Sequence, residues 1–370
     1  MQLTIKREIL SDRLADINNI AERKNTAPIL SHVLLEADSN GLVLKGTDTE
    51  ISLSIHCQEV EVIEPGAITV PVGKLLEAVK HQRAESLIGC QLVEGQFVLK
   101  TPESTFRLLT LPAEDFPAVA DSPSAYQLRI QSKVLHNLLT KVRFAMADQE
   151  PRAFLNGLYL HVVEEGKALH AVSSDGHRLA CGRGLLESEA NPEAKLILPK
   201  KAVSELIRLL GRVDEVVTLE VSERQLTLVL GAYRFSTRLI DGTYARYQEV
   251  IPVRQENPVL IPRNALIEAL QRAKVLLSDR RDGVYLRFKE SSVQISGRNT
   301  ANESLEESLD IVNNAAVDYE IGLNVAYLLQ ACQNLESESL QLHLSGNSGA
   351  CLLTGEADSH LSFVIMTMRL

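Results

Sequence analysis

Residues 3–10 read Leu-Thr-Ile-Lys-Arg-Glu-Ile-Leu, residues 128–135 read Leu-Arg-Ile-Gln-Ser-Lys-Val-Leu, and residues 259–266 read Val-Leu-Ile-Pro-Arg-Asn-Ala-Leu. In each stretch the apolar residues first alternate and then take helical spacing, which predicts a short strand that leads into a helix. The central isoleucines, Ile5, Ile130 and Ile261, lie 125 and 131 residues apart. A pattern that recurs at a nearly constant period indicates three copies of one structural unit.

Two further patterns recur in the same three copies. Each copy contains a second strand-to-helix stretch, at residues 68–76, 196–203 and 320–328. Each copy also closes on a strand that opens with phenylalanine, at Phe106, Phe235 and Phe363, with steps of 129 and 128 residues. Proline-bearing linkers at residues 118–124 and 252–258 separate the copies. We therefore predict three domains, residues 1–124, 125–254 and 255–370.

The local patterns inside each copy predict the α+β class. Short apolar runs such as Leu42–Leu44 and Ile51–Leu53 favour antiparallel hairpins. Helical spacing is found in six stretches, at residues 7–24, 73–83, 132–143, 200–212, 263–274 and 323–335. Two helices in each copy are expected to pack on antiparallel sheets, because an amphipathic helix buries its apolar face on another element.

Composition narrows the class of protein. No run of 18 or more apolar residues occurs, and the first residues lack the apolar core of a signal peptide, so we expect a cytoplasmic protein with no membrane partner. The five cysteines are widely spaced and form no Cys/His cluster with metal-ligand spacing, so we expect buried thiols, no metal and no cofactor. Tryptophan is absent and aromatic residues make up 4% of the chain, which argues against an aromatic platform for single-stranded nucleic acid.

Charge is unevenly distributed along the chain. The formal net charge is −10, which alone argues against a nucleic-acid partner. The six predicted helices, however, contain 17 Lys and Arg against 7 Asp and Glu, a net charge of +10, and leave −20 for the rest. Helices gathered on one side would attract a polyanion there. Without a base-reading motif, that binding is expected to be independent of nucleotide sequence.

Motifs along the whole chain resemble one family, the bacterial DNA polymerase III beta subunit or sliding clamp. They include Asp175-Gly176-His177-Arg178-Leu179-Ala180, Leu111-Pro112-Ala113-Glu114-Asp115-Phe116-Pro117 and the terminal Met366-Thr367-Met368-Arg369-Leu370. The resemblance implies the DNA-clamp fold and a head-to-tail homodimer that closes into a ring around double-stranded DNA. It implies a non-enzymatic processivity factor. The implied partners are the DNA polymerase III catalytic subunit, the clamp loader, and other polymerases and repair proteins that carry short linear motifs.

The resemblance also implies a partner-peptide pocket, with one wall in the middle copy and the other at the end of the chain. The matching positions are Leu155, Ser174, Gly176, His177, Arg178, Leu179, Val250, Val364, Met366, Met368 and Arg369. At two rim positions, Ala245 and Thr367, relatives often have proline, so we expect a rim of different shape. Methionine and aliphatic side chains make an adaptable apolar floor, which suits several different partners.

The resemblance implies a ring interface and a DNA-contacting surface as well. One interface edge would hold Phe106, Arg107 and Leu108, and the other Leu276, Leu277, Glu303, Glu306 and Glu307. Relatives carry additional arginines before the phenylalanine, where this chain has Glu103, Ser104 and Thr105. Arg23, Lys24, Gln149 and Arg152 fall on DNA-contacting loop positions of the family, and the helix charge adds Lys74, Lys80, Lys141, Lys200 and Arg208.

Two alternatives stay open from the sequence. A specialised or duplicate clamp with a changed partner set would share these motifs, and Ala245, Thr367 and the missing arginines favour it. A hydrolase would use Asp175 and His177, but no nucleophile motif such as G-x-S-x-G lies near them, and a turn explains the neighbouring serines. The first copy has Gly46-Thr47-Asp48 at the equivalent strand–turn–strand position. We therefore interpret the middle copy as specialised for peptide docking.

Overall fold

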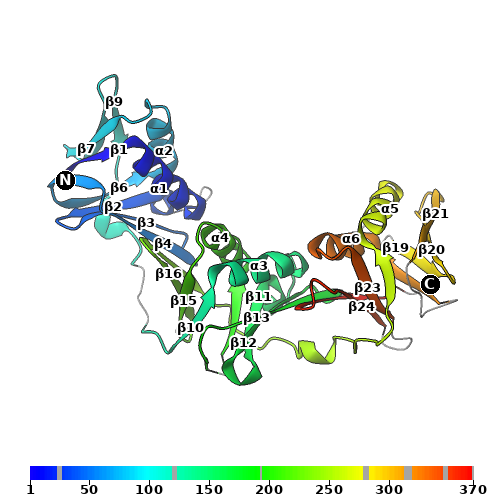
Figure 1. Ribbon diagram of the computed structural model, residues 1–370. Helices are drawn as coiled ribbons and strands as arrows, with labels where there is room; N and C mark the ends of the chain where they lie inside the picture. The colour runs from blue at the N-terminus through cyan, green and yellow to red at the C-terminus, as the bar shows by residue number, and fades with distance from the viewer. Residues whose placement is uncertain are drawn as a thin grey trace. The chain divides into compact units, whose positions relative to one another are not determined.

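The structure is a computed structural model that describes residues 1–22, 27–118, 123–191, 194–277, 283–311, 319–344 and 349–368. These residues divide into two compact units, each of which is described by itself (Figure 1). The first unit comprises residues 1–129 and 217–239, and the second comprises residues 130–216 and 240–370. The middle copy is shared between the units because several of its strands join a sheet of the first copy.

The first unit contains two antiparallel sheets. A five-stranded sheet in the order β5-β1-β7-β8-β9 consists of β1 (Gln2–Lys6), β5 (Val60–Glu64), β7 (Leu87–Val93), β8 (Gln96–Lys100) and β9 (Thr105–Leu109). An eight-stranded sheet in the order β10-β15-β16-β17-β4-β3-β2-β6 consists of β2 (His32–Asp38), β3 (Gly41–Thr47), β4 (Ile51–Cys57), β6 (Gly66–Pro71), β10 (Tyr126–Gln131), β15 (Val216–Val221), β16 (Gln225–Leu230) and β17 (Tyr233–Arg238). This sheet passes from the first copy to the middle copy where β4 pairs with β17.

Helices α1 (Arg7–Ile20) and α2 (Val72–Lys80) pack against each other on these sheets (Figure 1). Helix α1 buries Leu10, Leu14 and Ile17, whose spacing places them on one helical face, and it contacts β3 and β4. Burying a leucine side chain stabilises the folded chain by roughly 1.5–3 kcal/mol. Helix α2 follows Pro71 directly, a position where proline is tolerated because the first turn needs no amide donor.

The second unit follows the same plan. An eight-stranded antiparallel sheet in the order β14-β11-β12-β13-β25-β24-β23-β18 consists of β11 (Gly157–Val163), β12 (Ala168–Ser174), β13 (Arg178–Leu185), β14 (Lys195–Pro199), β18 (Val259–Pro262), β23 (Ser339–Leu344), β24 (Ala350–Gly355) and β25 (Leu361–Met366). A four-stranded sheet in the order β21-β20-β19-β22 consists of β19 (Gly283–Phe288), β20 (Ser292–Arg298), β21 (Ser304–Asp310) and β22 (Glu320–Asn324). The larger sheet passes from the middle copy to the last copy where β13 pairs with β25.

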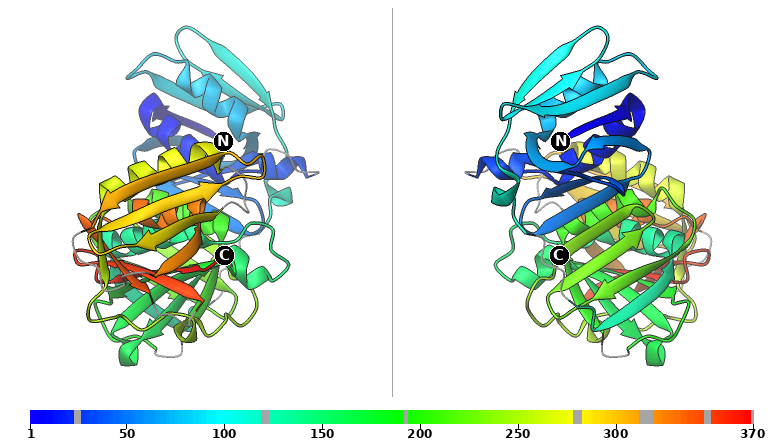
Figure 2. Two further views of the ribbon diagram at one scale, coloured as in Figure 1. Left: turned by 90° about the vertical axis from the view of Figure 1, so that its right-hand side faces the viewer. Right: turned by 90° about the vertical axis from the view of Figure 1, so that its left-hand side faces the viewer.

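Four helices cover the sheets of the second unit. Helix α3 (Ser132–Val142) pairs with α4 (Lys200–Leu210), and α5 (Arg263–Leu276) pairs with α6 (Val325–Asn334). Figure 2 shows α5, in yellow, lying along the sheet that contains β20 and β21, in gold, and these elements are in contact. Short 3₁₀ helices connect the larger elements, at Pro28–Ser31, Ala113–Asp115, Arg143–Ala145, Ala153–Asn156, Glu164–Gly166 and Tyr247–Glu249.

The described residues contain six α-helices, two in each copy, which confirms the predicted plan. Several helices are shorter than predicted: α1 ends at Ile20 rather than residue 24, and α2 ends at Lys80 rather than residue 83. Within the observed bounds the helices contain 12 Lys and Arg against 6 Asp and Glu, so their net charge is +6 and the predicted value of +10 was too high. Among these described helices, none combines the length and apolar character that crossing a membrane requires.

Candidate functional site

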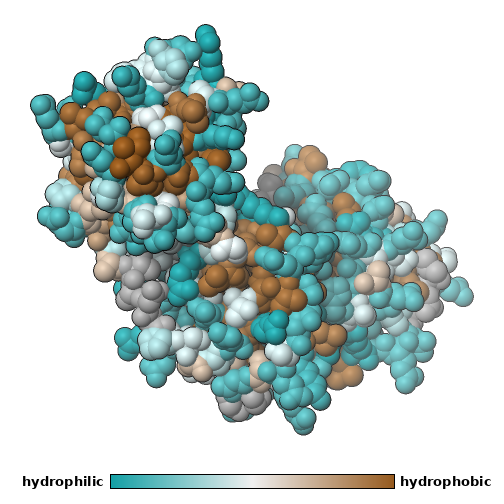
Figure 3. Space-filling view, turned by 60° about the vertical axis from the view of Figure 1, so that its left-hand side comes forward, coloured by the Kyte–Doolittle hydropathy of each residue, from teal (hydrophilic) through white to brown (hydrophobic). Residues whose placement is uncertain are grey.

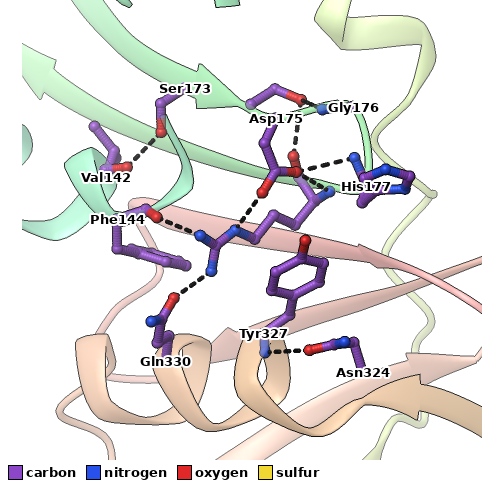
Figure 4. A network of polar contacts seen from close by, with 11 residues as sticks. Val142, Phe144, Ser173, Asp175, Gly176, His177, Asn324, Tyr327 and Gln330 are labelled. Carbon is purple, nitrogen blue, oxygen red and sulfur yellow. Dashed lines mark hydrogen bonds and ion pairs between the residues drawn. The ribbon is translucent and has the colours of Figure 1, made fainter. Parts of the chain in front are cut away.

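The turn between β12 and β13 is fixed by a network of hydrogen bonds (Figure 4). The Asp175 Oδ1 atom accepts from the backbone amides of His177 and Arg178, both at 3.0 Å. The Ser174 hydroxyl donates to the Arg178 carbonyl oxygen at 2.8 Å and accepts from the Gly176 amide at 3.1 Å. Gly176 takes the left-handed φ of +88°, where a side chain would strain the backbone. The carboxylate and the hydroxyl therefore serve to hold the turn.

The Arg178 side chain is nearly buried and fully engaged. Its Nε donates to Asp175 Oδ2 at 2.9 Å, and its two terminal nitrogens donate to the Phe144 carbonyl oxygen and to the Gln330 side chain (Figure 4). The guanidinium also lies 4.4 Å from the ring centre of Tyr327, a favourable cation–π contact. Only 11% of its side chain is exposed. Arg178 thus joins the β12–β13 turn to helix α6, and its charge is already paired.

These contacts oppose the hydrolase interpretation. The Asp175 carboxylate binds the His177 backbone and the Arg178 guanidinium, so it has no contact that would orient the His177 imidazole. The Ser173 hydroxyl donates to the Val142 carbonyl oxygen, and the Ser174 hydroxyl donates within the turn. Nucleophilic catalysis requires a hydroxyl within hydrogen-bond reach of a base, and the described contacts contain no such pair at this turn.

The two predicted walls of the pocket meet in one sheet. Strand β13 pairs with β25, so that Leu179 lies opposite Val364 and Arg178 lies opposite Ile365. The Met366 amide then donates to the His177 carbonyl oxygen at 2.9 Å. Because side chains alternate across a strand, Val364 and Met366 point to the same face of β25. A direct backbone hydrogen bond therefore joins positions 177 and 366, which are 189 residues apart in the sequence.

An apolar cluster underlies this junction. It contains three predicted pocket residues, Leu155, Leu179 and Val364, which are 4%, 5% and 1% exposed. The remaining members come from the surrounding strands and the segment after β17: Ala147, Tyr159, Val172, Cys181, Ile197, Tyr244, Tyr247, Ala350 and Leu352. Met366 and Val250 stay 40% and 46% exposed. An apolar floor with exposed apolar side chains at its edge suits an apolar ligand.

Aromatic rings form one part of this cluster. The rings of Tyr159 and Tyr244 stack at 4.6 Å with an interplanar angle of 2°, and Phe154 meets Tyr244 edge-on at 5.7 Å. The Tyr247 hydroxyl lies 2.8 Å from His170 Nδ1. Burial raises the pKa of the Tyr244 and Tyr247 hydroxyls, because a phenolate is poorly solvated there. Both phenols therefore remain neutral, and the floor presents no charge to a ligand.

The remaining predicted pocket residues lie in different surroundings. Ala245 is exposed beside the cluster, and the Thr367 amide donates to the Gly349 carbonyl oxygen at 2.9 Å. Met368 lies apart from the cluster: its amide donates to the Gly322 carbonyl oxygen at 2.8 Å, and its sulfur packs where a side chain on Gly283 would stand. The expectation that Met368 forms the floor beside Met366 is therefore not met by the described contacts. Arg369 lies outside the described residues.

A polar cleft also adjoins the turn. It has a volume of about 540 Å³ and extends from Asp175, His177 and Arg178 to the start of helix α6. Its opposite wall is the loop of residues 146–150, which includes Gln149. One turn thus borders both an apolar cluster and a polar cleft.

Comparisons with known proteins agree over the full length. Family models of the N-terminal, central and C-terminal domains of the DNA polymerase III beta subunit match residues 1–120, 129–246 and 248–369. The beta sliding clamp of Pseudomonas putida is 35% identical over 370 residues, with both chains covered completely. The chain belongs to the DNA polymerase III beta subunit family, the beta sliding clamps.

Solved structures agree with this assignment. The crystal structure of the DNA polymerase III beta subunit from Pseudomonas aeruginosa aligns with a TM-score of 0.95 and 32% identity, with both chains covered completely. A second P. aeruginosa clamp structure, bound to griselimycin, aligns with a TM-score of 0.93 and 33% identity over both whole chains. The chain is therefore a DNA sliding clamp, a non-catalytic processivity factor. It has the partners of this family: double-stranded DNA, a second copy of itself, and the polymerase and other proteins that dock through a peptide pocket.

The predicted DNA contacts of the clamp fall into two groups. In the first unit, Lys74 and Lys80 line a groove of about 440 Å³ between the end of α1 and helix α2. In the second unit, Lys200 forms an ion pair with Asp148 at 3.4 Å, next to Gln149, and Arg152 binds Glu150 at 2.7 Å. The side chains of Lys200 and Arg152 are 50% and 56% exposed. Arg23 and Lys24 lie outside the described residues.

Two other predicted DNA contacts are poorly placed to meet a phosphate. Lys141 is 12% exposed and donates to Glu336 at 2.6 Å, so its charge is used inside the unit. Arg208 is 23% exposed and donates to Glu205 at 2.8 Å. The helix charge pointed to both, but it could not distinguish a side chain held in an ion pair from a free cation.

Most of the predicted interface residues lie at two free sheet edges. Phe106 and Leu108 belong to β9, the edge of the five-stranded sheet, and line an apolar cavity of about 470 Å³ against helix α2. Leu109 beside them is 75% exposed. Figure 3 shows apolar surface on the first unit. Glu306 and Glu307 belong to β21, the edge of the four-stranded sheet, and Glu307 binds Arg272 of α5.

One predicted interface residue lies in the core instead. Leu277 is 1% exposed and packs so closely on Gly297 that a Cβ there would collide with it. Val275, which the sequence motifs did not single out, is 78% exposed at the end of α5. The spacing of Leu266, Leu270 and Ala273 carries the buried face of α5 to Leu277 and leaves Val275 on the opposite face. That spacing could have identified Val275 from the sequence.

Proposed function

We propose that the cluster around Leu155, Leu179 and Val364 is the pocket in which this clamp binds short linear motifs of the polymerase catalytic subunit, the clamp loader, and other polymerases and repair proteins. The observation that carries the proposal is the Met366–His177 backbone bond, which joins the two walls above this cluster. Exposed Met366 and Val250 form the rim. A motif residue buried on this floor exchanges water for apolar contacts, worth roughly 25 cal/mol per Å² of apolar surface.

Griselimycin, the ligand in the P. aeruginosa clamp structure, is a suitable probe of the pocket. We expect the wild-type chain to bind griselimycin in calorimetric titration and Met366→Lys to bind at least tenfold more weakly, because the lysine places a charge at the apolar rim. Val229→Lys is the matched control, since Val229 is also 40% exposed but belongs to β16, in the other unit. Equal affinity of Met366→Lys and the wild type would contradict the proposed pocket.

We further infer that the ring closes through the two free sheet edges. Phe106, Leu108 and exposed Leu109 of one copy would meet Val275 and Leu276 of the next, with β9 beside β21. Arg107 on β9 is exposed, and Glu306 on β21 offers the opposite charge. This is a head-to-tail contact between different surfaces, so two such contacts close a dimer. Glu303 and Glu307, which bind Asn299 and Arg272 within the chain, lie at the margin of this edge.

For DNA, we propose contacts through Lys74 and Lys80 in the first unit and through Gln149, Arg152 and Lys200 in the second. These side chains are exposed, and their ion pairs can be exchanged for phosphate contacts because exposed pairs are worth only about 0–1 kcal/mol. We also propose that the clamp acts in the cytoplasm. We further propose that its domain boundaries lie near residues 124 and 254, which the three family matches support.

A specialised clamp with a changed partner set is the second candidate. Ala245 and Thr367 favour it, because both stand at the pocket rim and both have an amide hydrogen that proline lacks. Loading onto nicked circular DNA, followed by a polymerase processivity assay, distinguishes a replicative clamp from a specialised one. A replicative clamp lengthens the products. A folded ring that loads but leaves product length unchanged would support the specialised clamp.

A further inference from the structure

The turn after β3 in the first copy repeats the framework of the β12–β13 turn. The Thr47 hydroxyl donates to the Ile51 carbonyl oxygen at 2.8 Å, as Ser174 does to Arg178. Asp48 Oδ1 accepts from the amides of Glu50 and Ile51 at 2.9 and 2.8 Å, as Asp175 Oδ1 does in the middle copy. Thr49 has a φ of +80°, close to the +88° of Gly176.

The neighbouring strand is also held in the same way. The Arg238 amide at the end of β17 donates to the Glu50 carbonyl oxygen at 2.9 Å, the same distance as from Met366 to His177. The registers agree, since Thr237 lies opposite Ile51 and Ile365 lies opposite Arg178. Position by position, the first junction then has Glu50, Ser52, Ser236 and Arg238 where the partner pocket has His177, Leu179, Val364 and Met366.

A pocket is present at the first junction, and it lies within the first unit. Its volume is about 210 Å³, and it is lined by Thr47, Thr49, Glu50, Ile51, Ser52, Pro117, Ala118, Gln225, Ser236, Thr237 and Arg238. The hydroxyl residues Thr47, Ser52, Ser236 and Thr237 are 4%, 8%, 4% and 1% exposed. The apolar floor of the middle junction is thus replaced here by buried hydroxyls on the same backbone framework.

Two charged side chains of opposite sign, the acceptor Glu50 and the donor Arg238, lie at the mouth of this pocket. Glu50 and Arg238 flank it, and among the described residues neither side chain has an ion-pair partner. A carboxylate ligand would meet the Glu50 charge, and an ammonium ligand would meet the Arg238 charge. An apolar ligand would cover the Glu50 and Arg238 charges without offering either of them a hydrogen bond. A carboxamide satisfies both, because its NH₂ donates to Glu50 while its oxygen accepts from Arg238.

We propose that the first junction is a second docking pocket of the clamp, which binds a glutamine or asparagine side chain of a partner polypeptide. The volume admits one such side chain rather than a longer motif. The site is separate from the apolar pocket because it lies in the other unit. It has the same turn framework, but its lining is polar rather than apolar. It gives each chain two docking points of different chemistry.

The absence of tryptophan from the chain allows a direct test. Ala118→Trp places a single tryptophan at the mouth of the first-junction pocket, and the full-length clamp is titrated with four matched peptides. The peptides are acetyl-Ser-X-Gly-X-Ser-amide with X as glutamine, glutamate, lysine or leucine. We expect a saturable fluorescence change with the glutamine peptide and at least about fivefold weaker binding of the other three, since each lacks at least one of the two hydrogen bonds.

Two substitutions complete the test. Arg238→Met removes the donor and is expected to weaken the glutamine peptide about tenfold. The triple change Ser52→Leu, Ser236→Val and Arg238→Met, which copies the middle junction, is expected to reverse the preference in favour of the leucine peptide. An unchanged thermal melt shows that each variant is folded, and retained griselimycin binding tests the apolar pocket of the second unit separately. Equal binding of all four peptides, or no saturable change with glutamine, overturns the proposal.

Discussion

The Met366 amide donates a hydrogen bond to the His177 carbonyl oxygen at 2.9 Å. This bond fixes the end of the chain to a turn in the middle copy, and it places exposed Met366 beside the cluster that holds Leu179 and Val364. The Thr367 amide extends the pairing by donating to Gly349, and the Met368 amide donates to Gly322. Three consecutive amides thus hold the C-terminal wall in place, which would preorganise the proposed pocket for a ligand.

Thr367→Pro is expected to loosen this wall. Proline removes the amide that donates to the Gly349 carbonyl oxygen, so only two of the three backbone bonds remain. We expect griselimycin to dissociate faster, with a two- to tenfold weaker affinity, which corresponds to a hydrogen bond of about 0.5–1.5 kcal/mol. Surface plasmon resonance measures both rates. Thr367→Val keeps the amide and serves as the control, and equal dissociation rates for proline and valine would contradict the role of this bond.

Arg178→Ala is expected to destabilise the second unit. The substitution leaves the Asp175 carboxylate, which is 15% exposed, without its ion-pair partner, and it removes the link to Gln330 on α6. Breaking a buried pair in this way costs about 3–5 kcal/mol of unfolding free energy. Urea denaturation measures the loss. Arg183→Ala breaks an exposed pair with Glu164 and should cost less than about 1 kcal/mol. Similar losses for the two variants would show that Arg178 is not a structural link.

Stability should depend on pH through His170. Burial lowers the pKa of His170, and the neighbouring His161 and Arg183 lower it further against the opposing effect of Glu164. The unfolded chain therefore binds a proton at a higher pH than the folded chain does. The stabilisation is complete above the ordinary histidine pKa of about 6.5, and it is lost as the pH falls through the lowered value. Thermal melts between pH 7.5 and 5 should show a smaller fall of Tm for His170→Gln. Parallel curves for variant and wild type would refute this assignment.

Charge reversal at Arg152 and Lys200 should weaken binding to DNA. We expect Arg152→Glu with Lys200→Glu to lower affinity for duplex DNA at low salt and to reduce the slope of log K against log salt by about 0.9 for each phosphate that is no longer neutralised. Fluorescence anisotropy over a salt series measures both. Arg246→Glu is the matched control, because Arg246 is 86% exposed but lies beside the proposed peptide pocket rather than among the proposed DNA contacts. A fall in affinity that is independent of salt would argue for a structural effect instead.

Val275→Asp should dissociate the ring. The side chain is 78% exposed at the end of α5, and a charge there would be buried in the proposed contact with β9. We expect the variant to sediment as a monomer at concentrations where the wild type is a dimer. Val253→Asp, at a valine that is 85% exposed on the linker after η6 (Tyr247–Glu249), should leave the dimer intact. A dimeric Val275→Asp variant would remove this residue from the interface.

The repeated plan was predictable because it rests on backbone patterning. The alternation around Ile5, Ile130 and Ile261 and the change to helical spacing are local, so all six helices were expected where they occur. The equivalence of Asp48 and Asp175 could also be predicted from the sequence, because the aspartate of such a turn accepts hydrogen bonds from backbone amides only a few residues away.

The residues whose positions differ from the prediction depend on contacts distant in sequence. The side chain of Lys141 is taken up by Glu336, 195 residues away, and Met368 is held by Gly322 rather than by the pocket. The Arg178 guanidinium donates to the Phe144 carbonyl oxygen and to the Gln330 side chain, so it points into the second unit and is not available to a peptide. Composition and spacing carry no information on such pairings, which only the folded sheet establishes.

Strand β21 has a consequence for the order in which two chains meet. Its exposed positions are Ser304, Glu306, Ser308 and Asp310, and it is an open edge. Two such edges brought together repel each other, and charged edges resist the strand-to-strand stacking that leads to fibres. In the proposed ring, this charge disfavours contact between the C-terminal copies of two chains. It leaves β21 to meet the apolar edge of β9, which fixes the head-to-tail order of the two chains.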